Sequence, residues 1–220
     1  MSKGQLFQAL SQTVDRLSRK TSLIGPYRIQ RLEQAAQRIT DHFTPEQTLH
    51  FAVVCTHNAR RSQMGQAWLQ ALATYHDLPN IQAFSAGTET SAFHPNAVKA
   101  LISLGFQIEG TTDTRNPMYH TLFGEALAGF TQYSKTIFDA RLPQENLVAI
   151  MVCRSAEEAC PLIPGAPLRL SIPFTDPGKA DQTPEAPAAY LATAEEIGLT
   201  FHYLFVEIKK AWNKKAQRKG

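Results

Sequence analysis

The chain has 220 residues, of which 43% are hydrophobic and 19% are charged, a balance typical of a folded globular protein rather than a disordered one. No apolar run reaches the roughly 20 residues that cross a bilayer, and the polar N-terminal segment lacks the apolar stretch of a secretion signal. Three cysteines are too few for the disulfide framework of a small secreted domain. We therefore expect a cytoplasmic protein with no membrane partner, whose cysteines begin as thiols.

The net charge of +3 is unevenly distributed along the chain. Residues 209–220 hold six of the 22 basic residues and none of the acidic ones, so the rest of the chain has 16 basic residues against 19 acidic ones. We interpret this basic segment as the solvated end of a C-terminal helix, where lysines interact favourably with the helix dipole. No aromatic platform or known nucleic-acid motif accompanies it, so nucleic acid is not an expected partner.

The first part of the chain has the spacing of two amphipathic helices. Apolar residues recur at helical intervals on both sides of Gly25-Pro26, a pair that commonly separates helices. They are Leu6, Leu10, Val14 and Leu17, then Ile29, Leu32, Ala35 and Ile39. We expect a two-helix N-terminal extension over residues 1–45, and one larger domain over residues 46–220 that ends in the basic helix.

After residue 46, short apolar runs alternate with amphipathic helices. Strands are predicted at residues 49–54, 81–84 and 147–152, and helices at 62–75, 95–104 and 188–212, the last interrupted by Gly198. Segment 111–143 has no clear pattern, and we interpret it as loop with some helix. The alternation predicts an α/β fold with a parallel sheet covered on both sides. Ligands of such folds bind at the carboxyl ends of strands, and Cys55 directly follows the first strand.

A short polar turn joins this strand to the next helix within residues 51–64, FAVVCTHNARRSQM. Backbone N–H groups of such a turn and the helix N-terminus form a concave anion site, to which Arg61 adds a guanidinium fork. These positive surroundings stabilise the thiolate of Cys55, the nucleophilic form of a cysteine. Asn58 can brace the loop, and Ser62 can donate a hydrogen bond to the sulfur. The loop therefore combines a nucleophile with a cradle for a tetrahedral oxyanion.

The run Cys55-Thr-His-Asn-Ala-Arg-Arg61-Ser62 resembles the C-x5-R-S phosphate loop of the low-molecular-weight protein tyrosine phosphatase family, which includes thioredoxin-coupled arsenate reductases. The pair Asp176-Pro177 lies late in the chain, where that family carries its general acid. The resemblance implies a four-stranded parallel sheet with helices on both faces. It also implies that Cys55 is the nucleophile, that Arg61 holds the oxyanion, and that Asp176 protonates the leaving oxygen.

The same resemblance places the whole loop around the oxyanion, with no metal and no bound cofactor. The expected oxyanion-binding residues are Thr56, His57, Asn58, Ala59, Arg60, Arg61 and Ser62. The ionisable side chains of two of them have no specific role in this interpretation. Arg60 is read as a solvated neighbour, and His57 as a surface histidine, since no second metal-type residue lies at ligand spacing.

A second pair of cysteines, Cys153 and Cys160, resembles the C-x6-C redox segment of the thioredoxin-coupled arsenate reductases. The resemblance implies that Cys55 attacks arsenate, that Cys153 attacks the adduct, and that Cys160 takes over the disulfide and presents it to thioredoxin. A helix over 153–160 would separate the two Cα atoms by about 10 Å, beyond the roughly 7 Å that a disulfide tolerates. We therefore expect this segment to be mobile or to rearrange between redox states. In the alternative interpretation both are core cysteines beside the sheet.

The leading prediction is an arsenate reductase that acts on a small oxyanion and takes electrons from thioredoxin. One alternative is a phosphatase with a cysteinyl-phosphate intermediate, because arsenate and phosphate present nearly the same tetrahedral charge. Gly178 follows Asp176-Pro177 where phosphatases of this family commonly carry a tyrosine, which weakens the expectation of a wall for an aromatic substrate. Another is a non-catalytic oxyanion or redox sensor whose N-terminal helices contact a partner.

Overall fold

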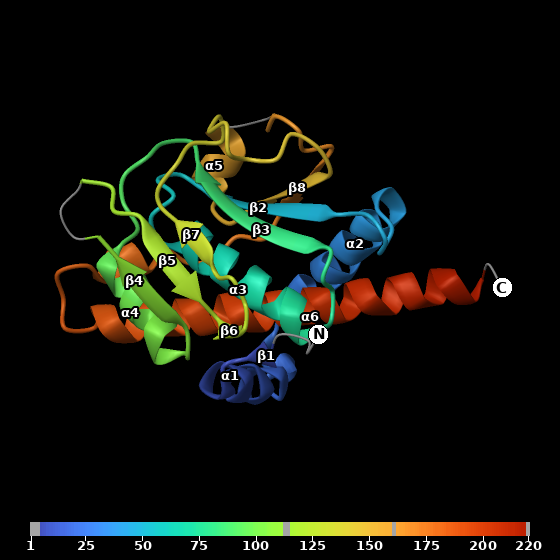
Figure 1. Ribbon diagram of the computed structural model, residues 1–220, viewed down its shortest axis with the longest axis horizontal. Coiled ribbons are helices and arrows are strands. Elements are labelled where there is room, and N and C mark those ends of the chain that lie inside the picture. The colour runs from blue at the N-terminus through green and yellow to red at the C-terminus, as the bar shows by residue number, and fades with distance from the viewer. Residues whose placement is uncertain (1–4, 112–114, 160–161, 219–220) are drawn as a thin grey trace.

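A four-stranded parallel sheet forms the centre of the computed structural model, which describes residues 5–111, 115–159 and 162–218 (Figure 1). The strands, in spatial order, are β3 (Ile81–Gly87), β2 (Leu49–Cys55), β8 (Leu147–Met151) and β9 (Leu168–Ser171). The two central strands are almost wholly buried, as expected of parallel strands covered on both faces. The predicted α/β fold with a four-stranded parallel sheet is confirmed.

Helices flank this sheet on both sides. The helices that follow residue 60 are α3 (Arg61–Tyr75), α4 (Pro95–Ser103), α5 (Arg154–Ala159) and α6 (Ala186–Gln217). In the view of Figure 1, α5 lies on one side of the sheet, and α3 and α6 lie on the other. The predicted interruption of the last helix is wrong, because α6 continues through Gly198. A Cβ atom at Gly198 would lie 2.6 Å from Trp68 Cε2, so the glycine lets α3 and α6 approach closely.

Both predicted N-terminal helices are present. They are α1 (Gln8–Ser18) and α2 (Pro26–His42), joined by the short 3₁₀ helix η1 (Thr21–Leu23). Their buried apolar residues, such as Leu10 and Leu32, belong to the same hydrophobic core as the central sheet. The boundary at residue 45 stays a prediction, and the shared core means that the extension is packed onto the rest of the chain.

A second, antiparallel sheet includes two strands from segment 111–143, where we predicted loop with some helix. It consists of β4 (Gln107–Gly110), β5 (Tyr119–Leu122) and β7 (Phe130–Gln132), while β6 (Gly124–Glu125) pairs with β1 (Gln5–Leu6). The prediction of helix is wrong for the described part of segment 111–143. Strands of three or four residues are too short to show alternation, and pairing between them decides the structure. A parallel bridge between Gly87 and Thr136 then places the segment after β7 beside the end of β3.

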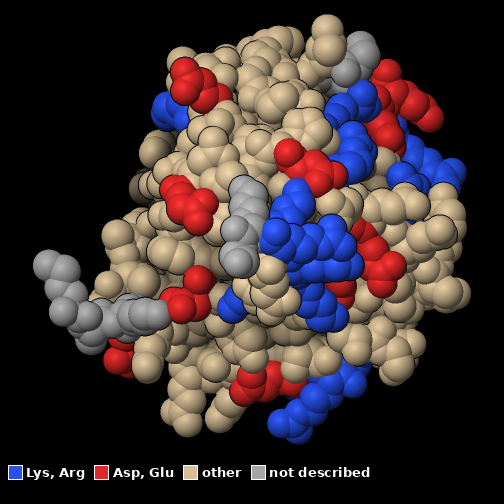
Figure 2. Space-filling model, turned by 90° about the vertical axis from the view of Figure 1, so that its right-hand side faces the viewer, with Lys and Arg blue, Asp and Glu red and all other residues tan. Residues whose placement is uncertain are grey.

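The basic C-terminal end of α6 is bound to α2 through one of its lysines. Lys214 and Lys215 lie in the last turn of the helix, as predicted. Lys215 Nζ donates to the Thr40 carbonyl at 2.7 Å and lies 2.6 Å from Asp41 Oδ1, so it binds α2 rather than standing free in solvent. Figure 2, which faces this end of the molecule, shows Asp and Glu side chains among the Lys and Arg side chains. Within the described ranges, no helix combines the length and apolar character needed to cross a membrane.

Candidate active site

Cys55 is the last residue of β2, and α3 begins six residues later at Arg61, as the sequence predicted. The Cys55 sulfur lies 3.0 Å from Ser62 Oγ in the first turn of α3. Ser62 Oγ also accepts a hydrogen bond of 2.8 Å from Asn58 Nδ2. The bond from Asn58 uses only a lone pair of Ser62 Oγ. The hydroxyl hydrogen of Ser62 therefore remains available for donation to the sulfur. The geometry therefore brings together Cys55 and the two residues that were expected to brace the loop and to donate to the sulfur.

Four carbonyl groups at this turn accept hydrogen bonds from outside it. The carbonyls belong to Cys55, Thr56, His57 and Ala59, and the donors are the N–H groups of Thr88, Glu89 and His94 and the hydroxyls of Ser91 and Ser134. In a planar trans peptide, the N–H of the next residue points opposite to the carbonyl. The N–H groups of residues 56, 57, 58 and 60 therefore point away from these donors, where they can converge on an anion.

Arg61 lies between this turn and the loop that carries Asp176. Its Nη1 donates to the Phe174 carbonyl at 3.0 Å, and its Nη2 lies 2.5 Å from Asp176 Oδ2. Its Nε is buried and has no hydrogen-bond partner within the described ranges. Only 12% of the Arg61 side chain is exposed, so an ion pair or anion at this guanidinium is weakly screened by solvent. The structure therefore places together the arginine and the carboxylate that the resemblance implied.

The Asp176 side chain is also fixed from its own loop. Asp176 precedes the 3₁₀ helix η2 (Pro177–Ala180), and its Oδ1 accepts a hydrogen bond of 3.0 Å from the Gly178 N–H. The carboxylate is about one-third exposed. One oxygen is thus held by the backbone while the other faces Arg61, which keeps the group at the rim of the loop.

Arg60 is not the solvated neighbour that the sequence suggested. Its Nε donates to the Tyr190 hydroxyl at 2.6 Å, and its Nη2 pairs with Asp181 Oδ2 at 2.5 Å. Burial raises the pKa of Tyr190, so this hydroxyl stays protonated and donates to Asp181 Oδ1. The guanidinium also lies over Gly178, where an added Cβ would come within 2.9 Å of Arg60 Cζ. Arg60 therefore ties the oxyanion loop to the loop of Asp176.

His57 is exposed at the surface, as expected. More than half of its side chain is accessible, and its Nε2 lies 3.4 Å from Glu89 Oε2. Its backbone carbonyl, in contrast, is held by the hydroxyls of Ser91 and Ser134. His57 thus belongs to the site through its main chain.

Cys153 lies next to the oxyanion loop. The Val152 N–H donates to the Val54 carbonyl, so Cys55 and Cys153 lie at the carboxyl ends of two neighbouring parallel strands. The Cys153 sulfur is buried and lies 3.5 Å from Thr56 Oγ1 and 3.8 Å from Ser155 Oγ. Residues 154–159 form α5, and Cys160 lies outside the described residues. The expected rearrangement of segment 153–160 therefore stays a prediction.

A buried network of glutamines supports the loop, and sequence reasoning did not find it. Gln63 Nε2 donates to the carbonyls of Asn58 and Tyr133 and to Asn58 Oδ1. Gln132 Nε2, from β7, donates to the Gln63 carbonyl and to Gln63 Oε1. The antiparallel sheet thus holds the oxyanion loop from behind. The only local signal was the presence of three glutamines, Gln63, Gln66 and Gln70, in a helix that carries large apolar residues.

Lys135 is a further residue that the sequence did not single out. Its N–H donates to Asn58 Oδ1 at 2.9 Å, and its side chain is almost fully buried with Nζ 4.5 Å from the centre of the Tyr133 ring. Burial lowers the pKa of Lys135 to about 8. Its backbone supports the loop directly.

Comparisons with known proteins point to one family. Residues 50–121 match the family model described as low molecular weight phosphotyrosine protein phosphatase. An arsenate reductase of Halalkalibacterium halodurans is 31% identical over 148 residues, 66% of this chain and 86% of that protein. One from Bacillus licheniformis is 30% identical over 155 residues, 70% and 91% of the two chains. A low molecular weight protein tyrosine phosphatase from Bacillus subtilis superposes with a TM-score of 0.50 at 16% identity, covering 74% of this chain and 98% of that one.

Proposed function

Because the chain belongs to the low-molecular-weight phosphotyrosine protein phosphatase family, we propose that its oxyanion loop reduces arsenate to arsenite with the help of Cys153 and Cys160. The relatives named as arsenate reductases support this choice of substrate. The observation that carries the proposal is the position of the Cys153 sulfur, 3.5 Å from the hydroxyl of Thr56, which directly follows Cys55. Hydrolysis of a phosphate ester needs one thiolate, and a second thiol beside the loop suits a redox step.

The first step resembles attack on a phosphate ester. The Cys55 thiolate attacks arsenic, and an As–S bond forms while one As–O bond breaks. Asp176, which carries a proton when the oxyanion has taken its place at Arg61, gives that proton to the departing oxygen, which leaves as water. The guanidinium of Arg61 and the loop N–H groups stabilise the remaining oxygens, because they are positioned before the negative charge develops.

The next steps transfer two electrons to arsenic. The Cys153 thiolate attacks the Cys55 sulfur, an S–S bond forms, and the electron pair of the S–As bond moves to arsenic, which leaves as arsenite. The Cys160 thiolate then attacks Cys153, which releases the Cys55 thiolate and leaves a Cys153–Cys160 disulfide. Thioredoxin, as the proposed partner, reduces that disulfide. These steps need no bound cofactor or metal, and they suit the reducing conditions of the cytoplasm.

The test is an arsenate assay coupled to thioredoxin, thioredoxin reductase and NADPH. Wild type is expected to consume NADPH when arsenate is added, and Cys153→Ser and Cys160→Ser are each expected to abolish that consumption. Both variants should keep hydrolysis of p-nitrophenyl phosphate, which requires attack by Cys55 and then attack by water on the cysteinyl phosphate, but no second thiol. Cys55→Ser should lose both reactions. Arsenate-dependent NADPH consumption that survives Cys153→Ser would contradict the proposed relay.

Phosphatase activity is the second candidate, because Cys55, Arg61 and Asp176 are together sufficient for hydrolysis of a phosphomonoester. Hydrolysis of p-nitrophenyl phosphate without any arsenate turnover would favour it. A protein that binds inorganic phosphate but turns over neither substrate would instead be an oxyanion sensor.

A further inference from the structure

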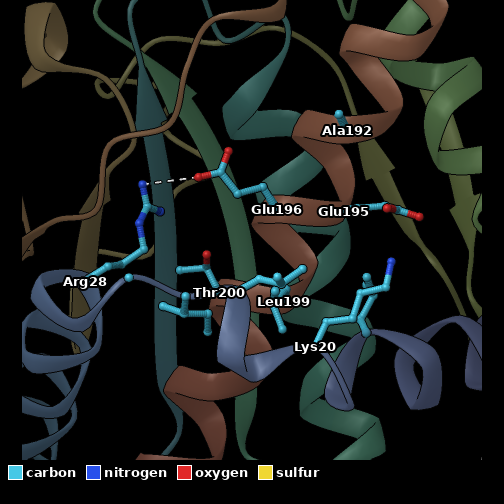
Figure 3. A pocket seen from close by; sticks show the side chains of 11 residues that line it. Lys20, Arg28, Ala192, Glu195, Glu196, Leu199 and Thr200 are labelled. Carbon is cyan, nitrogen blue, oxygen red and sulfur yellow. Dashed lines mark ion pairs between the residues drawn. The ribbon is translucent and has the colours of Figure 1, made fainter.

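Arg28, from α2 in the N-terminal extension, reaches the loop that leads to Asp176. Its Nη2 donates to the Pro173 carbonyl at 2.7 Å, and its Cζ lies 4.8 Å from the centre of the Phe174 ring. Figure 3 shows Arg28 extending from α2 toward α6, where its Nη2 lies 3.3 Å from Glu196 Oε1. The same arginine lines a cavity of about 350 Å³, none of whose lining residues belongs to the oxyanion loop.

Phe174, whose ring Arg28 covers, is also the residue whose carbonyl holds Arg61. The Phe174 carbonyl accepts a hydrogen bond from Arg61 Nη1, and Arg61 Nη2 in turn binds Asp176. Phe174 is buried, and its ring meets the ring of Phe201 in α6 edge to face, with the centroids 5.9 Å apart. A displacement of Phe174 would therefore move the acceptor that orients the Arg61 guanidinium.

Arginine is the side chain that can make both contacts at once. Its planar guanidinium stacks on an aromatic ring while its N–H groups donate in the same plane, whereas a lysine ammonium is a point charge without a face. The pair with Glu196 contributes less, because 28% and 44% of the two side chains are exposed and exposed ion pairs are weak. The contacts to Pro173 and Phe174 are thus the ones that matter for the loop.

We propose that Arg28 is a positioning residue through which the N-terminal extension holds Arg61 and Asp176 in place. The inference rests on the proposed function only in assigning the oxyanion to Arg61 and the proton to Asp176. It gives the extension a part in the chemistry of the larger domain.

The experiment compares two phosphate esters that share the first step of the reaction. Proton donation matters more when the leaving oxygen is more basic, so phenyl phosphate depends on Asp176 more than p-nitrophenyl phosphate does. Arg28→Met is expected to lower kcat/KM for phenyl phosphate about tenfold more than for p-nitrophenyl phosphate. General acid catalysis contributes roughly 10²–10⁴-fold to the rate, so this change corresponds to a partial loss of it. Arg28→Lys, which keeps a donor for the Pro173 carbonyl but lacks the planar group over Phe174, should give an intermediate ratio.

Two control variants separate this effect from charge and folding. Arg38→Met removes the same charge from an exposed position of α2, and Glu196→Gln removes only the ion pair. Both should keep the wild-type ratio between the two esters. Thermal unfolding confirms that each variant is folded. A uniform loss on both esters in Arg28→Met, or the same ratio change in Arg38→Met, would overturn the positioning role.

A second measurement does not require the protein to turn over any substrate. It therefore distinguishes failure of the proposed function from failure of this inference. Alkylation of Cys55 by iodoacetamide is measured with increasing inorganic phosphate, which protects a thiol that shares its pocket. Arg28→Met should need several-fold more phosphate than Arg38→Met for equal protection, because Arg61 is less well oriented. Equal protection of the two variants would overturn the inference, even for a wild type that hydrolyses neither ester.

Discussion

Arg61 and Asp176, 115 positions apart in the chain, form a hydrogen-bonded ion pair at the rim of the oxyanion loop. The carboxylate therefore occupies one donor of the guanidinium that would otherwise face a bound oxyanion. Since a guanidinium binds carboxylates and tetrahedral oxyanions with the same fork of donors, the two anions compete for Arg61.

Because of this competition, Asp176→Asn should weaken catalysis but strengthen the binding of phosphate. Loss of the proton donor should lower kcat for phenyl phosphate at least about 100-fold. Removal of the competing negative charge should make inorganic phosphate a tighter competitive inhibitor by several-fold. Steady-state kinetics with phosphate as inhibitor measure both. Asp41→Asn, on the surface of α2, is the control and should change neither. Weaker phosphate inhibition in Asp176→Asn would contradict this account of the ion pair.

The hydroxyl of Ser155 should matter only in the reductive half of the proposed reaction. Ser155 Oγ lies 3.8 Å from the Cys153 sulfur and 3.2 Å from Thr56 Oγ1. Losing one such hydrogen bond, worth about 0.5–1.5 kcal/mol, predicts that Ser155→Ala slows arsenate turnover about two- to tenfold while p-nitrophenyl phosphate hydrolysis stays at the wild-type rate. Ser18→Ala, at the end of α1, is the matched control, because it also removes one serine hydroxyl and its hydrogen bond. Equal slowing of both reactions would show that Ser155 acts on the fold instead.

The close approach of Arg60 to Gly178 predicts that alanine substitutions at Gly178 and at Gly25 differ in their effect on the free energy of unfolding. An added Cβ at Gly178 would lie 2.9 Å from Arg60 Cζ, whereas one at Gly25 would meet no atom within 4 Å. Gly178→Ala must displace the guanidinium from Tyr190 and Asp181, and overpacking of this kind costs about 1–3 kcal/mol of unfolding free energy. Gly25→Ala should stay near wild type. Urea unfolding of both variants measures the difference, and equal stabilities would show that Arg60 moves aside freely.

The oxyanion loop was predictable because its parts are neighbours in the sequence. Cys55, Asn58, Arg61 and Ser62 lie within eight residues, so a strand, a turn and a helix start suffice to bring them together. Asp176 could be assigned only through the family resemblance, because no local pattern connects it to Arg61. The strands β2, β3 and β8 followed from apolar runs that are visible along the chain. The fourth strand, β9, was implied only by the family resemblance, since its own residues were not recognised as a strand.

The errors concern residues whose surroundings come from distant segments. Arg60 is charged and lies in a loop, and only Tyr190 and Asp181, more than 100 residues away, explain why it is held. Gly198 was read as a helix break, because its packing partner Trp68 belongs to another helix. The antiparallel sheet was missed because its short strands depend on pairing with each other. Tertiary contacts thus override local propensity at each of these places.

A buried histidine pair predicts loss of stability in acid. His76, at the end of α3, and His202, in α6, lie with Nε2 and Nδ1 3.2 Å apart. Burial, with help from the charges of His202 and Lys209, lowers the pKa of His76 to about 3, and burial also lowers the pKa of His202. Asp15 opposes the shift at His202.

The unfolded chain, in which a histidine has a pKa of about 6.5, therefore binds more protons than the folded one between pH 6.5 and 3. The stability from the neutral pair is fully present above pH 6.5 and is lost as the pH falls toward 3. The double variant His76→Leu/His202→Leu removes both partners, so it leaves no unpaired polar group and should show a shallower decline of unfolding free energy with falling pH. His42→Leu, at the exposed end of α2, is the control and should keep the wild-type decline. Urea unfolding between pH 4 and pH 8 measures these slopes, and parallel curves for wild type and the double variant would refute the assignment.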